Sequence, residues 1–118
     1  MAENTAADVV QQYHDAWTNN RIDEAMALVA DDIVCRAPGQ DITGIEAYTE
    51  FIGGFAPMLT GVEEIGEFSD GDRIVRLYYP QTAETGTTPA AELFTVRDGK
   101  ITETVLMFDR LSYGPPPQ

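Results

Sequence analysis

Apolar side chains recur at helical spacing close to the start of the chain. Val9, Tyr13, Ala16 and Trp17 lie at positions i, i+4, i+7 and i+8, which places them on one side of a helix. The Asn-Asn-Arg segment 19–21 interrupts this pattern, and Asn tolerates the left-handed backbone that a helix end requires. The pattern therefore predicts a first helix that begins after a polar cap at residue 4 or 5 and ends at this turn.

A second helical pattern follows at once. Ile22, Ala25, Met26 and Val29 again share one side, so we expect a helix that continues to about residue 29. Asp23 is suitably placed to cap its N-terminus.

The next segment contains a short strand and a third helix. Residues 33–37 are predicted to form a strand that the Pro-Gly pair 38–39 ends, and residues 40–43 are predicted to be a loop. Thr43 and Glu46 have the spacing of a capping box, which predicts a helix over residues 44–52. Two glycines at 53–54 are expected to stop it.

From residue 61 onward the apolar period changes from helical to two. The alternation predicts strands over residues 61–68, 73–80, 89–96 and 101–109. Tight turns at 69–72 and 97–100 and a longer polar connection at 81–88 join them. Three helices packed on a curved, mainly antiparallel sheet make an α+β fold, a cone that encloses a pocket. We expect one domain over residues 6–111, a frayed N-terminus at 1–5 and a flexible Pro-rich tail at 112–118.

Composition and length limit the function classes. The 118 residues, 43% of them hydrophobic, are enough for one packed core. No apolar run reaches the length of a membrane span, and the first ten residues lack the pattern of a secretory signal. A single cysteine, Cys35, excludes an internal disulfide, so we expect a cytoplasmic protein.

The charge narrows the choice of partners. With 20 acidic and 7 basic side chains the formal net charge is −13, so nucleic acid and anionic membranes are not expected partners. The charge itself indicates solubility. An open sheet of this kind needs its bare face covered, so we expect a homodimer.

Glu92 is the most informative polar residue. It shares a strand face with Ala90, Phe94 and Val96, and the other face of that strand is also largely apolar. A buried carboxyl would have a raised pKa and could serve as a general base or a protonated donor. The alternatives are a solvent-exposed strand end or an ion pair with an arginine of the sheet. Those arginines are Arg73, Arg76 and Arg97.

Other polar residues carry weaker signals. Tyr13 is either a core tyrosine or a phenol directed into a pocket as hydrogen-bond donor. His14 lies at the edge of the apolar stripe, where an exposed position is favoured over an acid–base role. Cys35 is expected to be a small core residue, and Asp41 is either a carboxylate at the pocket mouth or a solvated loop residue. No metal-binding or nucleophile spacing is present, so neither a metal nor another cofactor is expected.

Three stretches resemble a known superfamily. They are VVQQYHDAW…DEAMALVADDIV…AP, the GIEAY start of the third helix, and AAELFTVRDGKITE. Together they resemble the nuclear-transport-factor-2-like superfamily, whose fold is a cystatin-like α+β cone. Within it the chain is most similar to the SnoaL-like polyketide cyclases and the ketosteroid isomerases. The resemblance spans about residues 6–110.

The isomerase resemblance implies roles for two residues. Tyr13 matches a helix-borne tyrosine that donates a hydrogen bond to the substrate oxyanion, and Glu92 matches a strand carboxylic acid that donates a second one. The general base of that family is an aspartate just before a proline, here Pro38. The residue before it is Ala37, which cannot move a proton.

The cyclase resemblance fits this chain better. Those enzymes place their acid/base carboxylate at the strand position of Glu92, usually as aspartate, and often add a pocket histidine that has no counterpart in residues 73–80. It implies proton transfer next to a carbonyl on a small apolar substrate. The alternative is a non-catalytic module that binds an apolar ligand or a protein. Candidate pocket walls, chosen by residue type and strand parity, are Trp17, Phe55, Leu77, Phe94, Leu106 and Phe108.

Overall fold

The computed structural model describes residues 5–83, 86 and 88–109. Its elements in order are α1 (Ala6–Thr18), α2 (Ile22–Met26), β1 (Val29–Ala37), β2 (Gln40–Thr43), α3 (Ile45–Phe55), the 3-10 helix η1 (Ala56–Met58), β3 (Gly61–Asp70), β4 (Arg73–Gln81), β5 (Ala90–Arg97) and β6 (Lys100–Met107). The described residues form a six-stranded sheet in the order β2-β1-β6-β5-β4-β3. The β1–β6 pair is parallel and the other pairs are antiparallel.

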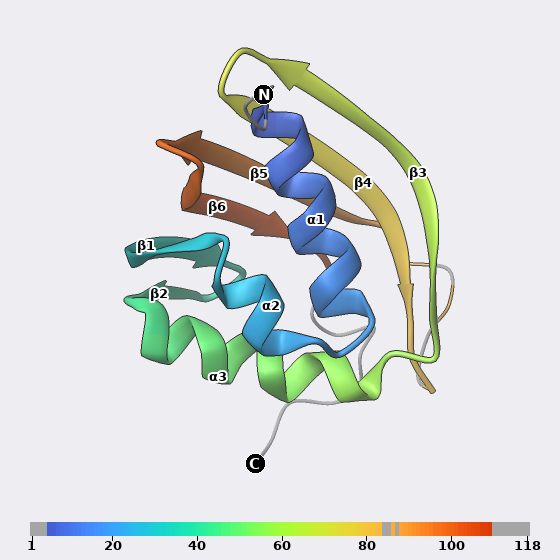
Figure 1. Cartoon of the computed structure of the whole chain (residues 1–118). Coiled ribbons are helices and arrows are strands. Elements are labelled where there is room, and N and C mark those ends of the chain that lie inside the picture. Colours follow the sequence, from blue (N-terminus) through green and yellow to red (C-terminus); the bar gives the residue numbers. More distant parts are fainter. Residues whose placement is uncertain (1–4, 84–85, 87, 110–118) are drawn as a thin grey trace.

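The expected α+β cone is confirmed. Figure 1 shows a strongly curved sheet with α1 lying across its concave side and α3 below the β1–β2 edge. The strand register shifts at two places, between Glu64 and Gly66 of β3 and between Thr95 and Val96 of β5. Such bulges bend strands and increase their twist, which is how a sheet curves around one helix.

Helix α1 forms as its sequence predicts. Thr5 and Asp8 make a reciprocal capping box, with Asp8 N–H donating to Thr5 Oγ1 at 3.1 Å and Thr5 N–H donating to Asp8 Oδ2 at 3.0 Å. The helix ends at the predicted turn, where Asn20 has a φ of 60°. The alternative cap, Asn4, lies outside the described residues.

The second helix is shorter than predicted. It ends at Met26, and Arg21 rather than Asp23 is its N-cap residue, without a side-chain cap bond. Val29 instead begins β1 and pairs with Ile101 of β6. Val29 is β-branched and therefore favours a strand. Its pairing with β6 outweighs the local helical pattern.

Residues 40–43 are a strand and not the expected loop. They form β2, which pairs with β1 through Cys35 opposite Ile42 and Ala37 opposite Gln40. Gly39 supplies the positive φ of 80° in the connecting turn. A strand this short, with a buried Ile42 among exposed polar neighbours, carries little periodic signal.

The third helix begins and ends differently from the prediction. Gly44 is its N-cap with a φ of 89°, so the capping box of Thr43 and Glu46 does not form. The helix also continues through Gly53 and Gly54. Each glycine costs a helix about 1 kcal/mol relative to alanine, and burial of the apolar α3 face against the core offsets that cost.

The four long strands agree with the prediction to within two residues at each end. The β3–β4 turn consists of Gly71 and Asp72, and the β5–β6 turn of Asp98 and Gly99. Both residues of the second turn have positive φ, 53° and 78°, as a type I′ hairpin requires.

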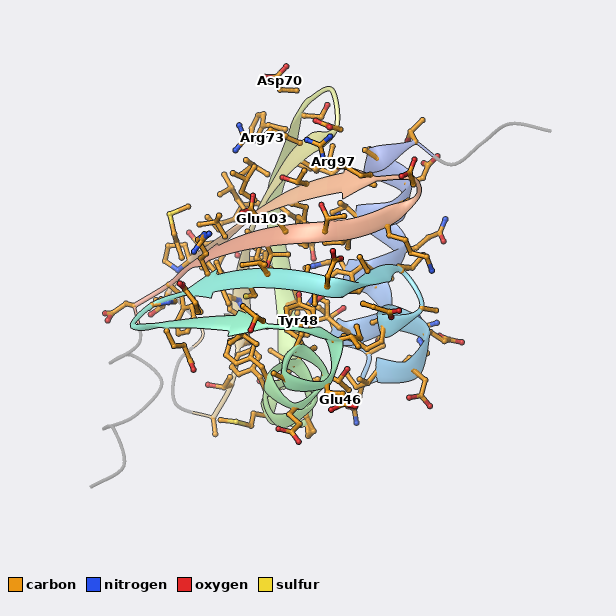
Figure 2. All side chains as sticks on the ribbon, turned by 90° about the vertical axis from the view of Figure 1, so that its left-hand side faces the viewer. Glu46, Tyr48, Asp70, Arg73, Arg97 and Glu103 are labelled. Carbon is orange, nitrogen blue, oxygen red and sulfur yellow. The ribbon has the colours of Figure 1, made fainter. Side chains whose placement is uncertain are left out.

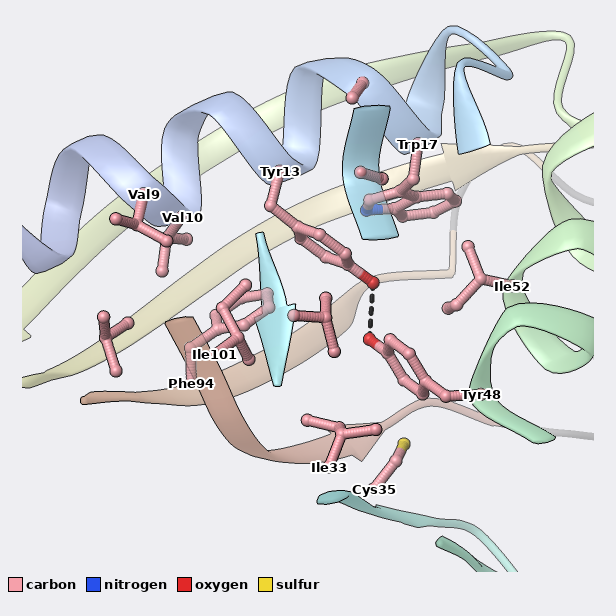
Figure 3. Packing of buried hydrophobic residues seen from close by; sticks show 14 of the residues in the cluster. Val9, Val10, Tyr13, Trp17, Ile33, Cys35, Tyr48, Ile52, Phe94 and Ile101 are labelled. Atoms are coloured by element: carbon pink, nitrogen blue, oxygen red, sulfur yellow. Dashed lines mark hydrogen bonds between the residues drawn. The ribbon is translucent and has the colours of Figure 1, made fainter. Parts of the chain in front are cut away.

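The core fills the space between α1 and the concave face of the sheet. Figure 3 shows Tyr13 of α1 and Tyr48 of α3 joined by their hydroxyls, with Ile33 of β1 below them and Ile101 of β6 to one side. Phe94 of β5 packs edge-on against the Tyr13 ring, with centroids 5.7 Å apart. Within the described part of the chain, no helix is long and apolar enough to cross a membrane. The frayed start predicted at 1–5 and the tail predicted at 112–118 lie outside it, except for Thr5.

Candidate functional site

A cavity of about 150 Å³ lies between the C-terminal end of α1, helix α3 and the inner face of β4, β5 and β6. Aromatic and aliphatic side chains form nearly all of its wall, and Glu92 supplies a carboxyl group. The residues that line it are Trp17, Phe51, Ile52, Phe55, Met58, Tyr78, Pro80, Ala90, Glu92, Leu106 and Phe108.

Glu92 lies on the inner face of β5, together with the three residues that its strand pattern places beside it. All four residues of that face, Ala90, Glu92, Phe94 and Val96, are buried. Glu92 itself is 3% exposed. The Tyr78 hydroxyl donates a hydrogen bond of 2.6 Å to Glu92 Oε1.

Burial raises the pKa of Glu92 from 4.5 to about 7. The apolar surroundings disfavour the charged carboxylate, while the hydrogen bond from Tyr78 and the positive charge of Arg76 favour it and limit the rise. A carboxyl with this pKa exists in both protonation states near neutral pH. It can therefore accept a proton from a bound molecule and return it.

The structure places Tyr13 in the core and not among the cavity residues. It is fully buried, and its hydroxyl forms a hydrogen bond with the Tyr48 hydroxyl. Burial is the main cause that raises the pKa of both phenols well above the usual value. Both hydroxyls are therefore protonated near neutral pH.

Four of the six residues predicted to line the pocket do line the cavity. Trp17, Phe55, Leu106 and Phe108 line the cavity. Phe94 shares the correct face but lies deeper, fully buried against Tyr13.

Leu77 and Asp41 lie elsewhere. Leu77 pairs with Ala91 and lies on the outer face of β4, because its neighbour Tyr78 is the residue that faces inward. Asp41 is exposed in β2, where Arg36 Nη1 lies 3.1 Å from its Oδ2. The prediction that Leu77 lines the pocket is wrong because both faces of β4 carry apolar residues. The inner face also includes a buried charge, Arg76, which obscures the alternation.

Tyr78 is a residue of the candidate site that sequence reasoning missed. It contacts Glu92 directly and lines the cavity. The sequence gives no local signal for this position, which follows from the cross-strand register: Tyr78 lies opposite Ala90, on the face that Ala90 shares with Glu92.

His14 is buried, contrary to the expected exposed position. It is 1% exposed, and its Nε2 lies 2.9 Å from Glu64 Oε2 on β3. Burial and the charge of Arg76 lower the pKa of the imidazole, more than its contact with Glu64 raises it. The wide sheet covers more of α1 than a single apolar stripe predicts.

No group of three or more His, Cys, Asp or Glu side chains that could hold a metal occurs among the described residues. Cys35 is buried on β1, and burial raises the pKa of its thiol to about 11, so it is a neutral core residue.

Comparison with known proteins agrees with this architecture. The model of the SnoaL-like domain family matches residues 10–104. A crystal structure from Kribbella flavida, described only as a protein of known function, is 38% identical with a TM-score of 0.86, over 90% of this chain and 88% of that chain. No curated protein matches the chain.

Two more distant structures share the fold. A protein of Kribbella flavida proposed to be a ketosteroid isomerase is 19% identical with a TM-score of 0.76, over 96% of this chain and 83% of that chain. A protein of Sinorhizobium meliloti proposed to be a polyketide cyclase is 22% identical with a TM-score of 0.76, over 85% of this chain and 94% of that chain. Since the family model extends from the first helix to the last strand, this chain belongs to the SnoaL-like domain family within the nuclear-transport-factor-2-like superfamily.

Proposed function

We propose that this protein is an isomerase- or cyclase-type enzyme that moves a proton next to a carbonyl, with Glu92 as its acid/base. The observation that carries the proposal is a buried carboxyl with a pKa of about 7 in the wall of an otherwise apolar cavity. Tyr78 occupies Glu92 Oε1, which leaves the second carboxyl oxygen to accept the proton. The isomerase and cyclase proposals made for distant relatives of the same fold agree with this class of reaction.

The cavity supports a small apolar molecule as the substrate. A volume of about 150 Å³ bounded by aromatic and aliphatic side chains suits a small apolar molecule. The expected oxyanion donor, Tyr13, would have to leave Tyr48 and enter the cavity. Tyr13 therefore has no role in the proposed reaction.

Exchange of the acidic protons of small apolar ketones tests this proposal. We expect the wild-type protein to catalyse their exchange with deuterium in D₂O, followed by proton NMR. Glu92→Gln keeps the size of the side chain but cannot accept the proton, so the rate is expected to fall by at least roughly 100-fold. Glu103→Gln, on β6 in a partly exposed position, is the matched control and is expected to retain the rate. Exchange that survives in Glu92→Gln would show that another group is the base.

A second candidate function is a non-catalytic module that binds a small apolar ligand. It is favoured by Ala37, which stands at the end of β1 where the isomerases carry their general base. One experiment distinguishes the two functions. A binding module would bind a cavity-sized ketone in both wild type and Glu92→Gln and would exchange its protons in neither.

We also propose a homodimer that covers the outer face of the sheet. Phe68 on β3 and Met107 on β6 are 64% and 54% exposed, and partly buried apolar residues connect them across the intervening strands. Figure 2 shows Asp70, Arg73 and Arg97 together at one end of the sheet. An apolar centre with charges at its margin is typical of an interface between copies.

Sedimentation at micromolar concentration tests the dimer. We expect a mass of about twice the 13.0 kDa of one chain. Leu93→Asp, in the middle of the outer face, is expected to give monomers because the dimer would bury an unpaired charge. Wild-type protein that sediments as a monomer would contradict the proposal.

A cytoplasmic location remains our proposal. It is supported by Cys35, a single buried thiol that has no cysteine partner in this chain.

A further inference from the structure

Glu67, Arg76 and Glu92 occupy one row across three neighbouring strands. Glu67 of β3 lies opposite Arg76 of β4, and Arg76 lies opposite Glu92 of β5. Directly opposed residues of an antiparallel pair have Cβ atoms about 4.5–5.5 Å apart. The long Arg76 side chain is therefore within reach of a carboxyl on either side.

The Arg76 guanidinium is directed to β3. Its Nη1 donates to Glu67 Oε1 at 2.7 Å, and its Nε and Nη2 lie 3.1 and 3.0 Å from Glu64 Oε1. Gln11 of α1 accepts a further hydrogen bond from Nη1 at 3.1 Å. Within the described residues the ion pairs of Arg76 go to these two glutamates, while Glu92 accepts from Tyr78.

We propose that Glu64 and Glu67 hold the Arg76 guanidinium on β3 and thereby keep it from forming an ion pair with Glu92. Both are positioning residues for the cavity carboxyl, so the inference rests on the proposed role of Glu92. Contact with an arginine would fix Glu92 as a carboxylate and occupy the oxygen that a substrate needs.

The burial of Arg76 explains why this arrangement requires two carboxylates. Its side chain is 8% exposed, whereas those of Glu64 and Glu67 are 47% and 30% exposed. A buried guanidinium needs acceptors for its donors, and two partly solvated carboxylates provide them at a small desolvation cost. Glu92 is fully desolvated and would be the costlier partner while the other two remain charged.

Helix α1 stabilises the same arrangement. His14 Nε2 contacts Glu64 Oε2, the oxygen that Arg76 does not use. The His14 ring also packs edge-on against the Tyr78 ring, with centroids 4.9 Å apart. His14 therefore contacts both Glu64, which binds Arg76, and Tyr78, which donates a hydrogen bond to Glu92.

The titratable groups that interact with Glu92 from α1, β1 and α3 are uncharged near neutral pH. The charge of Glu92 raises the pKa of Tyr13 of α1, Cys35 of β1 and Tyr48 of α3, while Tyr78 of β4 donates to it directly. Burial raises the pKa of the first three, so they are uncharged near neutral pH. The charge that can change the state of Glu92 is therefore that of Arg76.

The experiment measures the pKa of Glu92 by carboxyl carbon NMR in the folded full chain. In Glu64→Gln/Glu67→Gln, Arg76 loses both charged partners, and we expect it to pair with Glu92. The pKa of Glu92 is then expected to fall from about 7 to below the reference of roughly 4.3. The control, Glu63→Gln/Asp70→Asn, removes two negative charges from the same strand and is expected to leave the pKa near 7.

Equal pKa values in the double variant and in this control would overturn the inference. Arg76→Met supplies a second test in a chain that keeps both glutamates. It is expected to raise the pKa of Glu92 by less than the fall in the double variant, because Arg76 does not pair with Glu92 in the wild type. A rise as large as that fall would overturn the inference. A wild-type Glu92 that titrates at its ordinary value would instead contradict the proposed function, so the two failures are distinguishable without any measurement of turnover.

Discussion

Replacing Glu92 with glutamine is expected to raise the free energy of unfolding at pH 8 by about 3 kcal/mol. The reason is the raised pKa, since the folded protein holds this proton until about pH 7 and the unfolded chain loses it near 4.5. The difference between the two pKa values, at 1.36 kcal/mol per unit, gives that magnitude. Glutamine carries no charge into the cavity and can still accept the hydrogen bond from Tyr78.

The sign of this prediction follows from how the free energy of unfolding depends on pH. A carboxyl whose pKa is raised by folding favours the folded state below the unfolded value, and that contribution is lost as the pH rises through 4.5 to 7. Urea unfolding at pH 4 and pH 8 measures it, with a small difference between wild type and Glu92→Gln expected at pH 4. His14, whose pKa burial lowers, changes the stability of both proteins alike and cancels in the comparison. A glutamine variant less stable than wild type at pH 8 would contradict the burial of the charge.

Phe94→Ala is expected to lower the free energy of unfolding by about 3–5 kcal/mol. Phe94 is fully buried beside Tyr13, so truncation removes its transfer free energy and leaves a cavity in the centre of the core. Urea unfolding at constant pH measures the loss.

Phe108→Ala is the matched control. It removes the same group from the cavity wall, where the ring is only partly buried. We expect a distinctly smaller loss, because the ring already borders open space. Equal losses at the two positions would contradict the assignment of Phe94 to the core and of Phe108 to the cavity.

The sequence predicted the structure well for elements that pack one face against the core. Parity along β5 placed Ala90, Glu92, Phe94 and Val96 on one face, and the structure shows that this face is the buried one. Helix α1 likewise carried both an apolar side and a readable N-cap. These two elements position Glu92 and Trp17, and so a large part of the candidate site could be predicted.

The remaining features depend on contacts between distant residues. Arg76 and His14 are buried because Glu64 and Glu67, on another strand, provide partners for them, and no local pattern indicates such a partner. The position of Tyr78 beside Glu92 follows from the register between β4 and β5, which single-strand alternation does not define. Helix α3 continues through Gly53 and Gly54 because of tertiary packing, which outweighs local propensity.

Titration of Glu92 in the folded wild-type protein tests the central claim most directly. Carboxyl carbon NMR follows the side chain, and Glu92→Gln identifies its signal by its loss. We predict a pKa of about 7, as a desolvated carboxyl in an apolar cavity requires. A value at or below the reference of roughly 4.3 would show a solvated or arginine-paired group and would contradict an acid/base role for Glu92.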